Sequence, residues 1–357
     1  MDKIDVGIVG CGYVANGHLE AWRKAKQASV VAVSDVNESL VKNTARIWKV
    51  PFSHKSLSEM IEQGKVNLVD ICTPPQTHAS LAIQAMEAGL SVLIEKPMTM
   101  TTKDADEIVK CQRATGARAG VIHNWLFDDP ILEADSLVKQ GRVGKVFNME
   151  VEALNTKYDS MAANERHWCH QLPGGRFSEM LAHPIYLMRH FLGEVEMCDL
   201  QVSKIGDYPW MKSDELCATF KTGEKIGRAY ASFNTSREAI FVNLHCEEAI
   251  LKLDIINSTV NLLPKRKTSR FSKGFDSMRQ AGQLLKSTAS NTYKVALKRW
   301  LSGHDVCIKR FAESLVADTA PPVTIEEARS VIQVLEKMCE RIEMIEKSRE
   351  NNSIKAS

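Results

Sequence analysis

The sequence predicts an α/β protein of two domains, with a parallel sheet in the first domain and an open, mostly antiparallel sheet in an α+β second domain. Short apolar segments alternate with helical segments over residues 1–123, whereas several strand-like segments follow one another after residue 146. A glycine-rich turn also separates the first strand from the first helix. The chain has 357 residues, enough for two domains of about 100–200 residues each.

The first domain is predicted from nearly continuous runs of Val, Ile and Leu, which are typical of strands buried on both faces of a parallel sheet. Helical segments between such strands indicate βαβ units. The expected strands are Ile4–Val9, Val30–Ser34, Asn67–Cys72, Ser91–Ile94 and Ala119–Ile122. The expected helices are Tyr13–Lys26, a stretch ending near Trp48, Thr77–Ala88 and Thr102–Thr115.

The second domain is predicted over residues 124–345 and begins with a helix at Ile131–Gln140 and an alternating strand at Val146–Leu154. A helix over Arg176–Leu192 and a helical end over His304–Lys347 are also expected. Successive strands after a βαβ series favour an antiparallel sheet. These strands are Asp199–Lys204, Glu215–Thr222, Gly227–Asn234, Ile240–Cys246 and Ala249–Ile255. Residues 346–357 are expected to form a flexible tail.

The composition excludes several classes of protein. Hydrophobic residues make up 44% and charged residues 25% of the chain, which is ordinary for globular proteins and unlike disordered chains. The net charge of +2 gives no reason to expect a nucleic-acid partner. We find no apolar run of about 18 residues and no signal-peptide pattern. The nine cysteines are scattered and contain no Cys-x-x-Cys, which indicates a reducing compartment and a cytoplasmic location.

The turn that begins at Gly7 reads Gly-x-x-Gly-x-Gly-x-x-Ala and is predicted to bind a dinucleotide. Gly10 permits the tight turn, and Gly12 lets the backbone approach a pyrophosphate at the helix N-terminus. Asp35 ends the second strand, where a carboxylate accepts hydrogen bonds from a ribose 2′-hydroxyl and repels a 2′-phosphate. No Arg stands at position 36 or 37, so NAD is favoured over NADP. The cofactor contacts expected here are Gly10, Gly12, Tyr13, Val14 and Asp35.

The motif Glu95-Lys96-Pro97 follows the fourth strand of the first domain. Ligands of open parallel sheets bind beyond the carboxyl ends of the strands. Pro97 biases Lys96 to an extended conformation, which directs the lysine towards that crevice. A desolvated lysine there can donate to a substrate oxygen. Taken alone, the motif favours a surface lysine at a turn.

Together with Cys72–His78, these motifs resemble the Gfo/Idh/MocA oxidoreductase family. The resemblance continues at residues 124, 141–146, 173–175 and 320–328, and covers nearly the whole chain apart from about 256–302. It implies a Rossmann domain, a substrate domain with an open sheet, a homodimer or homotetramer, and NAD(P)-dependent hydride transfer at a carbohydrate or polyol carbon. By this resemblance Lys96 matches the catalytic lysine, Thr73, Pro74 and His78 match the cofactor-edge loop, and Glu95 and Asn124 match positions near the nicotinamide.

A second catalytic group is expected on the helix that follows the paired glycines. The family pattern Asp-x-x-x-His reads Glu179-x-x-x-His183 here, and this spacing places both side chains on one helix face. A carboxylate beside an imidazole orients the ring and raises its pKa. The resemblance implies that His183 is the acid/base, that Lys96 is its partner on the same oxygen, and that Glu179 orients His183. Glu in place of Asp adds a methylene and changes the reach of the carboxylate, so the family's substrate preferences do not carry over. Tyr186 stands where the family often has an acidic residue, so a polyol contact at that position does not carry over either. A structural histidine is the alternative for His183.

The loop before this helix is expected to contact the substrate. Arg166 and Arg176 could hold an anionic group as bidentate donors, although surface ion pairs explain them equally well. Trp168 is the third expected contact. Four potential zinc or iron ligands also lie here, namely His167, Cys169, His170 and His183. We expect no metal, because His-x-Cys-His is not a known ligand spacing and adjacent residues rarely converge on one ion.

A basic insertion is expected at residues 256–302. Between Pro264 and Trp300 ten Lys and Arg stand against one acid, Asp276. Met278–Leu301 reads as an amphipathic basic helix. Such a segment suits an anionic membrane surface, a phosphorylated lipid carrier or a phosphate-rich substrate. A solvated basic loop or a helix that docks a partner is the alternative to peripheral membrane contact through residues 264–301.

The sequence therefore predicts an NAD-dependent sugar dehydrogenase or reductase, acting on a nucleotide-linked or phosphorylated sugar. One alternative retains NAD and uses transient oxidation to assist elimination or hydrolysis. Another is an NAD-binding regulatory protein without turnover, because fold does not settle function.

Overall fold

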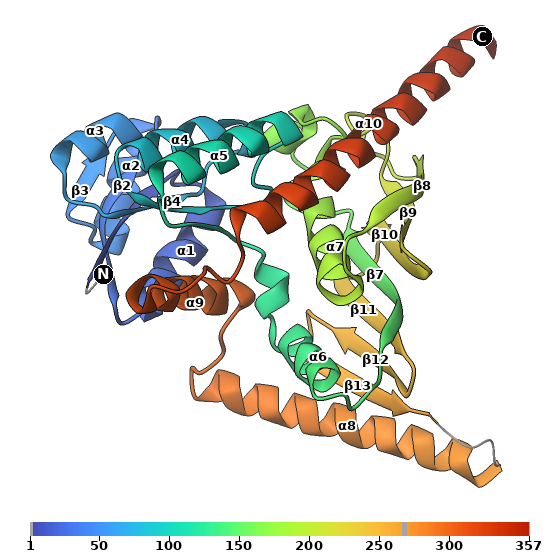
Figure 1. Ribbon diagram of the computed structural model, residues 1–357. Coiled ribbons are helices and arrows are strands. Elements are labelled where there is room, and N and C mark those ends of the chain that lie inside the picture. The colour runs from blue at the N-terminus through green and yellow to red at the C-terminus, as the bar shows by residue number, and fades with distance from the viewer. Residues whose placement is uncertain (1–2, 266–269, 357) are drawn as a thin grey trace. The chain divides into compact units, whose positions relative to one another are not determined.

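The computed structural model describes residues 3–265 and 270–356, which form two compact units (Figure 1). One unit comprises the chain up to Phe127 together with Leu301–Gln333, and the other comprises Asp128–Trp300 together with the segment from Val334 onwards. The sequence-based boundaries had assigned residues 301–333 to the second domain. None of the described helices combines the length and the apolar character needed to cross a membrane.

The first unit contains a six-stranded parallel sheet in the order β3-β2-β1-β4-β5-β6. This is the Rossmann order, in which the strand sequence reverses between β1 and β4. The predicted parallel sheet is thereby confirmed. The edge strand β3 has only three residues, too few to give a sequence signal. The strands are β1 Ile4–Val9, β2 Ala28–Ser34, β3 Phe52–His54, β4 Leu68–Ile71, β5 Ser91–Ile94 and β6 Ala119–Val121.

Helices cover both faces of this sheet (Figure 1). Right-handed crossovers that run in opposite directions from β1 and β4 place their helices on opposite faces. The helices are α1 Tyr13–Lys24, α2 Glu38–Trp48, α3 Leu57–Gln63, α4 His78–Glu87, α5 Thr102–Thr115 and α9 Gly303–Ala317, with short 3₁₀ helices η1 Pro75–Thr77 and η2 Asn124–Phe127.

The late helix α9 belongs to the first unit because it fills a face of the Rossmann sheet. Phe311 is fully buried, and a side chain at Gly120 on β6 would lie 2.9 Å from its ring. The segment that follows α9 also contacts this sheet, because the Val121 N–H donates a 3.3 Å hydrogen bond to the Val323 carbonyl oxygen. Glycine at position 120 is therefore needed for α9 to pack closely on β6. Because this contact joins segments far apart in the sequence, the order of segments along the chain led to residues 301–333 being assigned to the second domain.

The second unit contains a seven-stranded sheet in the order β13-β12-β11-β7-β10-β9-β8. Among the described strands of this sheet, β7 and β10 alone pair in parallel, and the other pairs are antiparallel. This confirms the mostly antiparallel sheet. The strands are β7 Val146–Thr156, β8 Glu196–Ser203, β9 Glu215–Thr222, β10 Lys225–Thr235, β11 Ala239–Cys246, β12 Ala249–Asp254 and β13 Thr259–Pro264.

Five further helical elements complete the described chain, namely α6 Asp129–Lys139, η3 Trp168–Gln171, α7 Arg176–Leu192, α8 Arg270–Ala296 and α10 Ile325–Ala356. Helix α7 packs on β10, where a side chain at Gly227 would lie 2.8 Å from the Met188 sulfur. Helix α8 lies along β13 at the sheet edge (Figure 1). Helix α10 continues through residues 346–356, which the sequence analysis had expected to be a flexible tail.

Candidate functional site

The glycine-rich turn between β1 and α1 fits a dinucleotide pyrophosphate. Gly10 has φ +93°, and a Cβ there would lie 2.7 Å from the Cys72 carbonyl oxygen. A Cβ at Gly12 would meet nothing within 4 Å, so this position leaves space beside the backbone. Gly12 caps α1 without a side-chain bond, and the first turn of α1 carries no acid. The first N–H groups and the positive end of the helix dipole are therefore available to phosphate oxygens.

Asp35 is held at the end of β2 by the same turn. Its Oδ2 accepts a 2.8 Å bond from the Cys11 N–H, and its Oδ1 accepts a 2.8 Å bond from the Asn37 N–H. Burial, together with the charge of Asp35, raises the pKa of the Cys11 thiol to about 11. The thiol therefore stays protonated at neutral pH, and the Asp35 carboxylate at this edge fits a ribose diol.

A buried network of charged groups lies behind the Glu95-Lys96-Pro97 motif. His18 on α1 is completely buried, with Nδ1 2.8 Å from Asp70 Oδ2 and Nε2 2.8 Å from Glu95 Oε1. Trp22 donates its indole N–H to the same Asp70 oxygen at 2.6 Å. His304, on α9, brings its Nε2 within 3.3 Å of Glu95 Oε1. Both nitrogens of His18 face carboxylate oxygens, an arrangement that two ring N–H donors satisfy.

The charges of this network follow from those contacts. Burial opposes ionisation of His18, but Asp70 and Cys72 together outweigh it, so the pKa of His18 lies well above its usual 6.5. Burial also opposes ionisation of Glu95, but the bonds from His18 and His304 lower the pKa of Glu95 well below its usual 4.5. Glu95 Oε2 then accepts a 2.9 Å bond from the Lys96 N–H. The network therefore fixes the backbone from which the Lys96 side chain departs.

His78 ties two loops at the cofactor edge together. The ring is fully buried, with Nε2 2.7 Å from the Thr73 carbonyl and Nδ1 3.1 Å from the Pro97 carbonyl. Burial lowers the pKa of His78, so the neutral ring has a single N–H and donates to one of these two carbonyls. Among the residues the structure describes, the Asn124 side-chain oxygen is buried without a hydrogen-bond partner. This buried oxygen of Asn124 could accept a hydrogen bond from a carboxamide N–H such as that of a nicotinamide.

The helix α7 residues lie in the second unit. His183 is 6% exposed, and its Nδ1 lies 2.6 Å from the Tyr186 hydroxyl. The Glu179 carboxylate forms an ion pair with Arg176, which also contacts Asp159 Oδ1 at 3.4 Å. Arg176 is itself buried. A substrate anion at Arg176 would therefore compete with two carboxylates that already balance its charge.

The loop before α7 folds onto itself. His167 Nδ1 accepts a 3.3 Å bond from the Cys169 N–H and thereby caps the short helix η3. His170 Nε2 lies 3.0 Å from the Met161 carbonyl. Trp168 is half-buried and Arg166 is exposed. The two residue groups in the described chain with metal-ligand spacing lie elsewhere, in the His18 network: His18, Asp70 and Cys72, and His18, Glu95 and His304.

Sequence reasoning missed His18, Asp70 and His304. Two signals for them were present: an acid within the apolar β4 run Leu68–Ile71, and a histidine on the apolar face of α1. Tyr186 was noted only as a departure from the family pattern. No sequence signal connected His304 with Glu95, because 209 positions separate them.

Comparisons with known proteins agree with this architecture. Residues 4–123 match the model of an oxidoreductase family with an NAD-binding Rossmann fold, and residues 131–252 match the GFO/IDH/MocA C-terminal domain. An oxidoreductase of Formosa agariphila is 30% identical over 200 residues, which cover 54% of this chain and 62% of that protein, less than two thirds of its length. The myo-inositol 2-dehydrogenase of Thermotoga maritima is 24% identical over 245 residues, 66% of this chain and 69% of that protein.

The fold is also that of solved structures. A WlbA dehydrogenase from Bordetella pertussis, crystallised with NADH and UDP-GlcNAcA, superposes with a TM-score of 0.77 at 19% identity. The superposition covers 95% of this chain and 96% of that one. At this level of identity the likeness establishes the fold alone.

Proposed function

The chain is an NAD-binding oxidoreductase of the GFO/IDH/MocA family, and from this premise we propose that it transfers a hydride between NAD and a carbinol carbon of a nucleotide-linked or phosphorylated sugar. The observation that carries the proposal is the buried support beneath Lys96. The fully buried imidazole of His18 and the ionised Glu95 hold the backbone of Lys96 in one position. A catalytic group has to be held within about 0.5 Å of its productive position, and this support meets that need.

We assign the proton to His183 and the orientation of the sugar oxygen to Lys96. When bound, NAD accepts the two electrons and the hydrogen that leave the sugar carbon. The hydroxyl proton passes to His183 as the C=O bond forms, and the Lys96 ammonium stabilises the negative charge that develops on that oxygen. Glu179 would orient His183 from the preceding helical turn. In the reducing direction the same groups return the proton.

The sugar class is proposed from the relatives. A structural neighbour holds a uridine-diphosphate sugar, and a homologue is named for inositol. A phosphate-bearing substrate would suit the exposed Arg166, with Trp168 as an apolar surface for a sugar ring. NAD is preferred over NADP because of the charge of Asp35.

The test is NADH formation by the purified protein with sugars, sugar phosphates and nucleotide sugars. Turnover on one class, lost in Lys96→Ala and in His183→Ala with NAD binding retained, is expected. A protein that binds NAD tightly but reduces none of it, while converting a sugar without net redox change, would refute net hydride transfer. No turnover on any substrate would favour a regulatory protein.

A further inference from the structure

Helix α8 carries its polar face inwards and its apolar face outwards. The inward face bonds to the rest of the second unit through Gln283, Asn291 and Lys294. Gln283 accepts a 2.8 Å bond from the Leu262 N–H and donates a 3.1 Å bond to the Leu262 carbonyl, so its amide completes the free edge of β13. Asn291 donates to the Ser258 carbonyl at 2.7 Å, and Lys294 pairs with Asp129 at 2.6 Å. These positions repeat at helical spacing on one face.

The opposite face of α8 is apolar and exposed. Met278 and Leu285 share it at helical spacing with alanines and a threonine, and Phe275 lies beside it. Each of these three large side chains is 72% exposed. Surface helices ordinarily turn their apolar stripe towards the protein core. An inverted stripe of this kind indicates that the apolar face of α8 meets an apolar surface outside the described chain.

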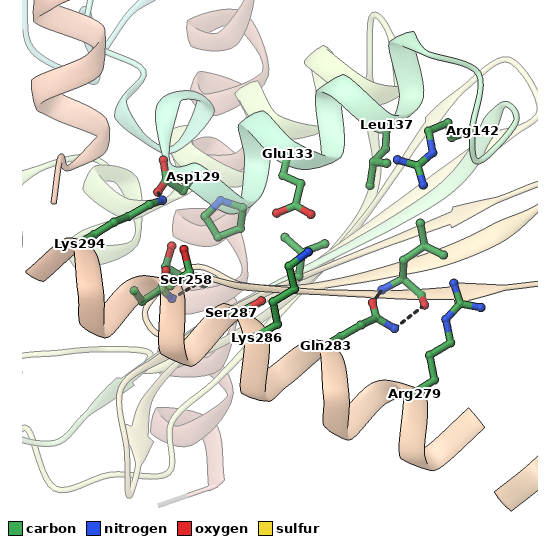
Figure 2. A pocket seen from close by; sticks show the side chains of 15 residues that line it. Asp129, Glu133, Leu137, Arg142, Ser258, Arg279, Gln283, Lys286, Ser287 and Lys294 are labelled. Carbon is green, nitrogen blue, oxygen red and sulfur yellow. Dashed lines mark hydrogen bonds and ion pairs between the residues drawn. The ribbon is translucent and has the colours of Figure 1, made fainter. Parts of the chain in front are cut away.

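Positive charge lies on the flank of α8 that faces α6 and just beyond the end of the helix. Lys286 and Arg279 are exposed, and Lys298 and Arg299 follow the helix. Arg279 and Arg142 point towards one another across an open cavity of about 510 Å³ between α6 and α8 (Figure 2). The carboxylates of Glu133 and Asp129 line the same cavity, so part of this positive charge is already balanced there. The segment 264–300 has ten basic residues and one acid in a chain whose net charge is only +2.

We propose that α8 is an interfacial helix that docks the protein onto an anionic lipid bilayer. Helices of this class bury an apolar face at the level of the lipid headgroups, with Lys and Arg beside it and aromatic residues at the boundary. Phe275 and Tyr293 (63% exposed) stand at that boundary. The rest of the chain is net acidic, so the attraction is confined to this segment. The match to the family's C-terminal domain ends at residue 252, before α8, so the docking is independent of the proposed oxidoreductase chemistry.

The experiment is co-flotation of the full-length protein with phosphatidylglycerol vesicles, compared with phosphatidylcholine vesicles. Binding to the anionic vesicles alone, weakened by added salt, is expected. The double variant M278Q/L285Q should reduce partitioning at least tenfold. The double variant R279Q/K286Q should reduce it about 30-fold, because each cation near an anionic surface contributes about a fivefold factor. Matched controls change other exposed groups: I205Q/M344Q, at 70% and 57% exposed, for the apolar pair and K65Q/K103Q for the cations.

Unchanged NADH binding together with an unchanged circular dichroism spectrum and thermal unfolding profile of every variant shows that both units retain their fold. Failure of the folded wild-type protein to bind anionic vesicles at low salt would overturn the proposal. So would equal losses in the matched controls. Light scattering without lipid measures self-association of the protein. If the wild-type protein self-associates and M278Q/L285Q does not, the apolar face of α8 binds a second copy of this chain and the proposal is wrong.

Discussion

Replacing His18 by glutamine would leave two buried carboxylates without their shared counter-ion. The imidazole is completely buried and lies 2.8 Å from both Asp70 and Glu95. A glutamine amide can donate to one of these oxygens but brings no charge. Breaking a buried ion pair on one side costs about 3–5 kcal/mol, against a usual total stability of about 5–15 kcal/mol. We therefore expect His18→Gln to lower the free energy of unfolding of the first unit by about 3–5 kcal/mol.

The pH dependence follows from the two shifted pKa values. The pKa of His18 is raised above 6.5 in the folded state, so its contribution is complete below pH 6.5 and declines as pH rises towards the folded value. The pKa of Glu95 is lowered below 4.5, so its contribution is complete above pH 4.5 and is lost as pH falls through the folded value. In the wild-type protein the network is therefore fully stabilising between about pH 4.5 and 6.5.

Hydrogen exchange of peptides from β1 and β4 at pH 6, over a urea series, measures the stability of this unit. His54→Gln is the matched control, because His54 is only partly buried and contacts one neutral side chain, Gln63; its effect should stay below about 0.5 kcal/mol. A loss below 1 kcal/mol in His18→Gln would refute the reasoning. In the wild-type protein, the imidazole signal of His18 is identified by its absence from His18→Gln. Titration of that signal near pH 6.5 would also contradict the raised pKa.

Four further outcomes are expected at the site. Gly10→Ala should destabilise the protein by at least about 1 kcal/mol in urea unfolding, because φ is positive and the new Cβ meets a backbone carbonyl oxygen at 2.7 Å. Gly12→Ala should change stability by less than about 0.5 kcal/mol but weaken NAD binding at least tenfold in fluorescence titration, since its Cβ fills only open space. Asp35→Asn should lower the ratio of kcat/KM for NAD to that for NADP by about 10–100-fold, the value of a hydrogen bond to a charged group; an unchanged ratio would contradict the ribose assignment. Tyr186→Phe should lower kcat about five- to tenfold with the KM for NAD unchanged, since it removes the hydroxyl 2.6 Å from His183 Nδ1; full activity would exclude a positioning role for Tyr186.

The alternation of apolar runs and helices was enough to predict the first sheet, because a parallel strand buried on both faces leaves a continuous apolar signature. Strand β3 was not predicted because three residues give no periodicity, and β13 was not predicted because it lies within the basic insertion. Helix α8 was anticipated as basic and amphipathic. Which of its faces turns outwards was not predictable, since periodicity defines a stripe but not the direction in which it points.

At the site, the glycine turn, Asp35 and the Lys96 motif could be predicted from sequence, because each depends on neighbouring residues and local backbone geometry. The tertiary structure decided what supports them. Glu95 meets His18 across 77 positions and His304 across 209, and α9 covers the first sheet although it follows the second domain in sequence. Such contacts are set by how distant segments pack and by which buried charges must be compensated, and no local pattern encodes either.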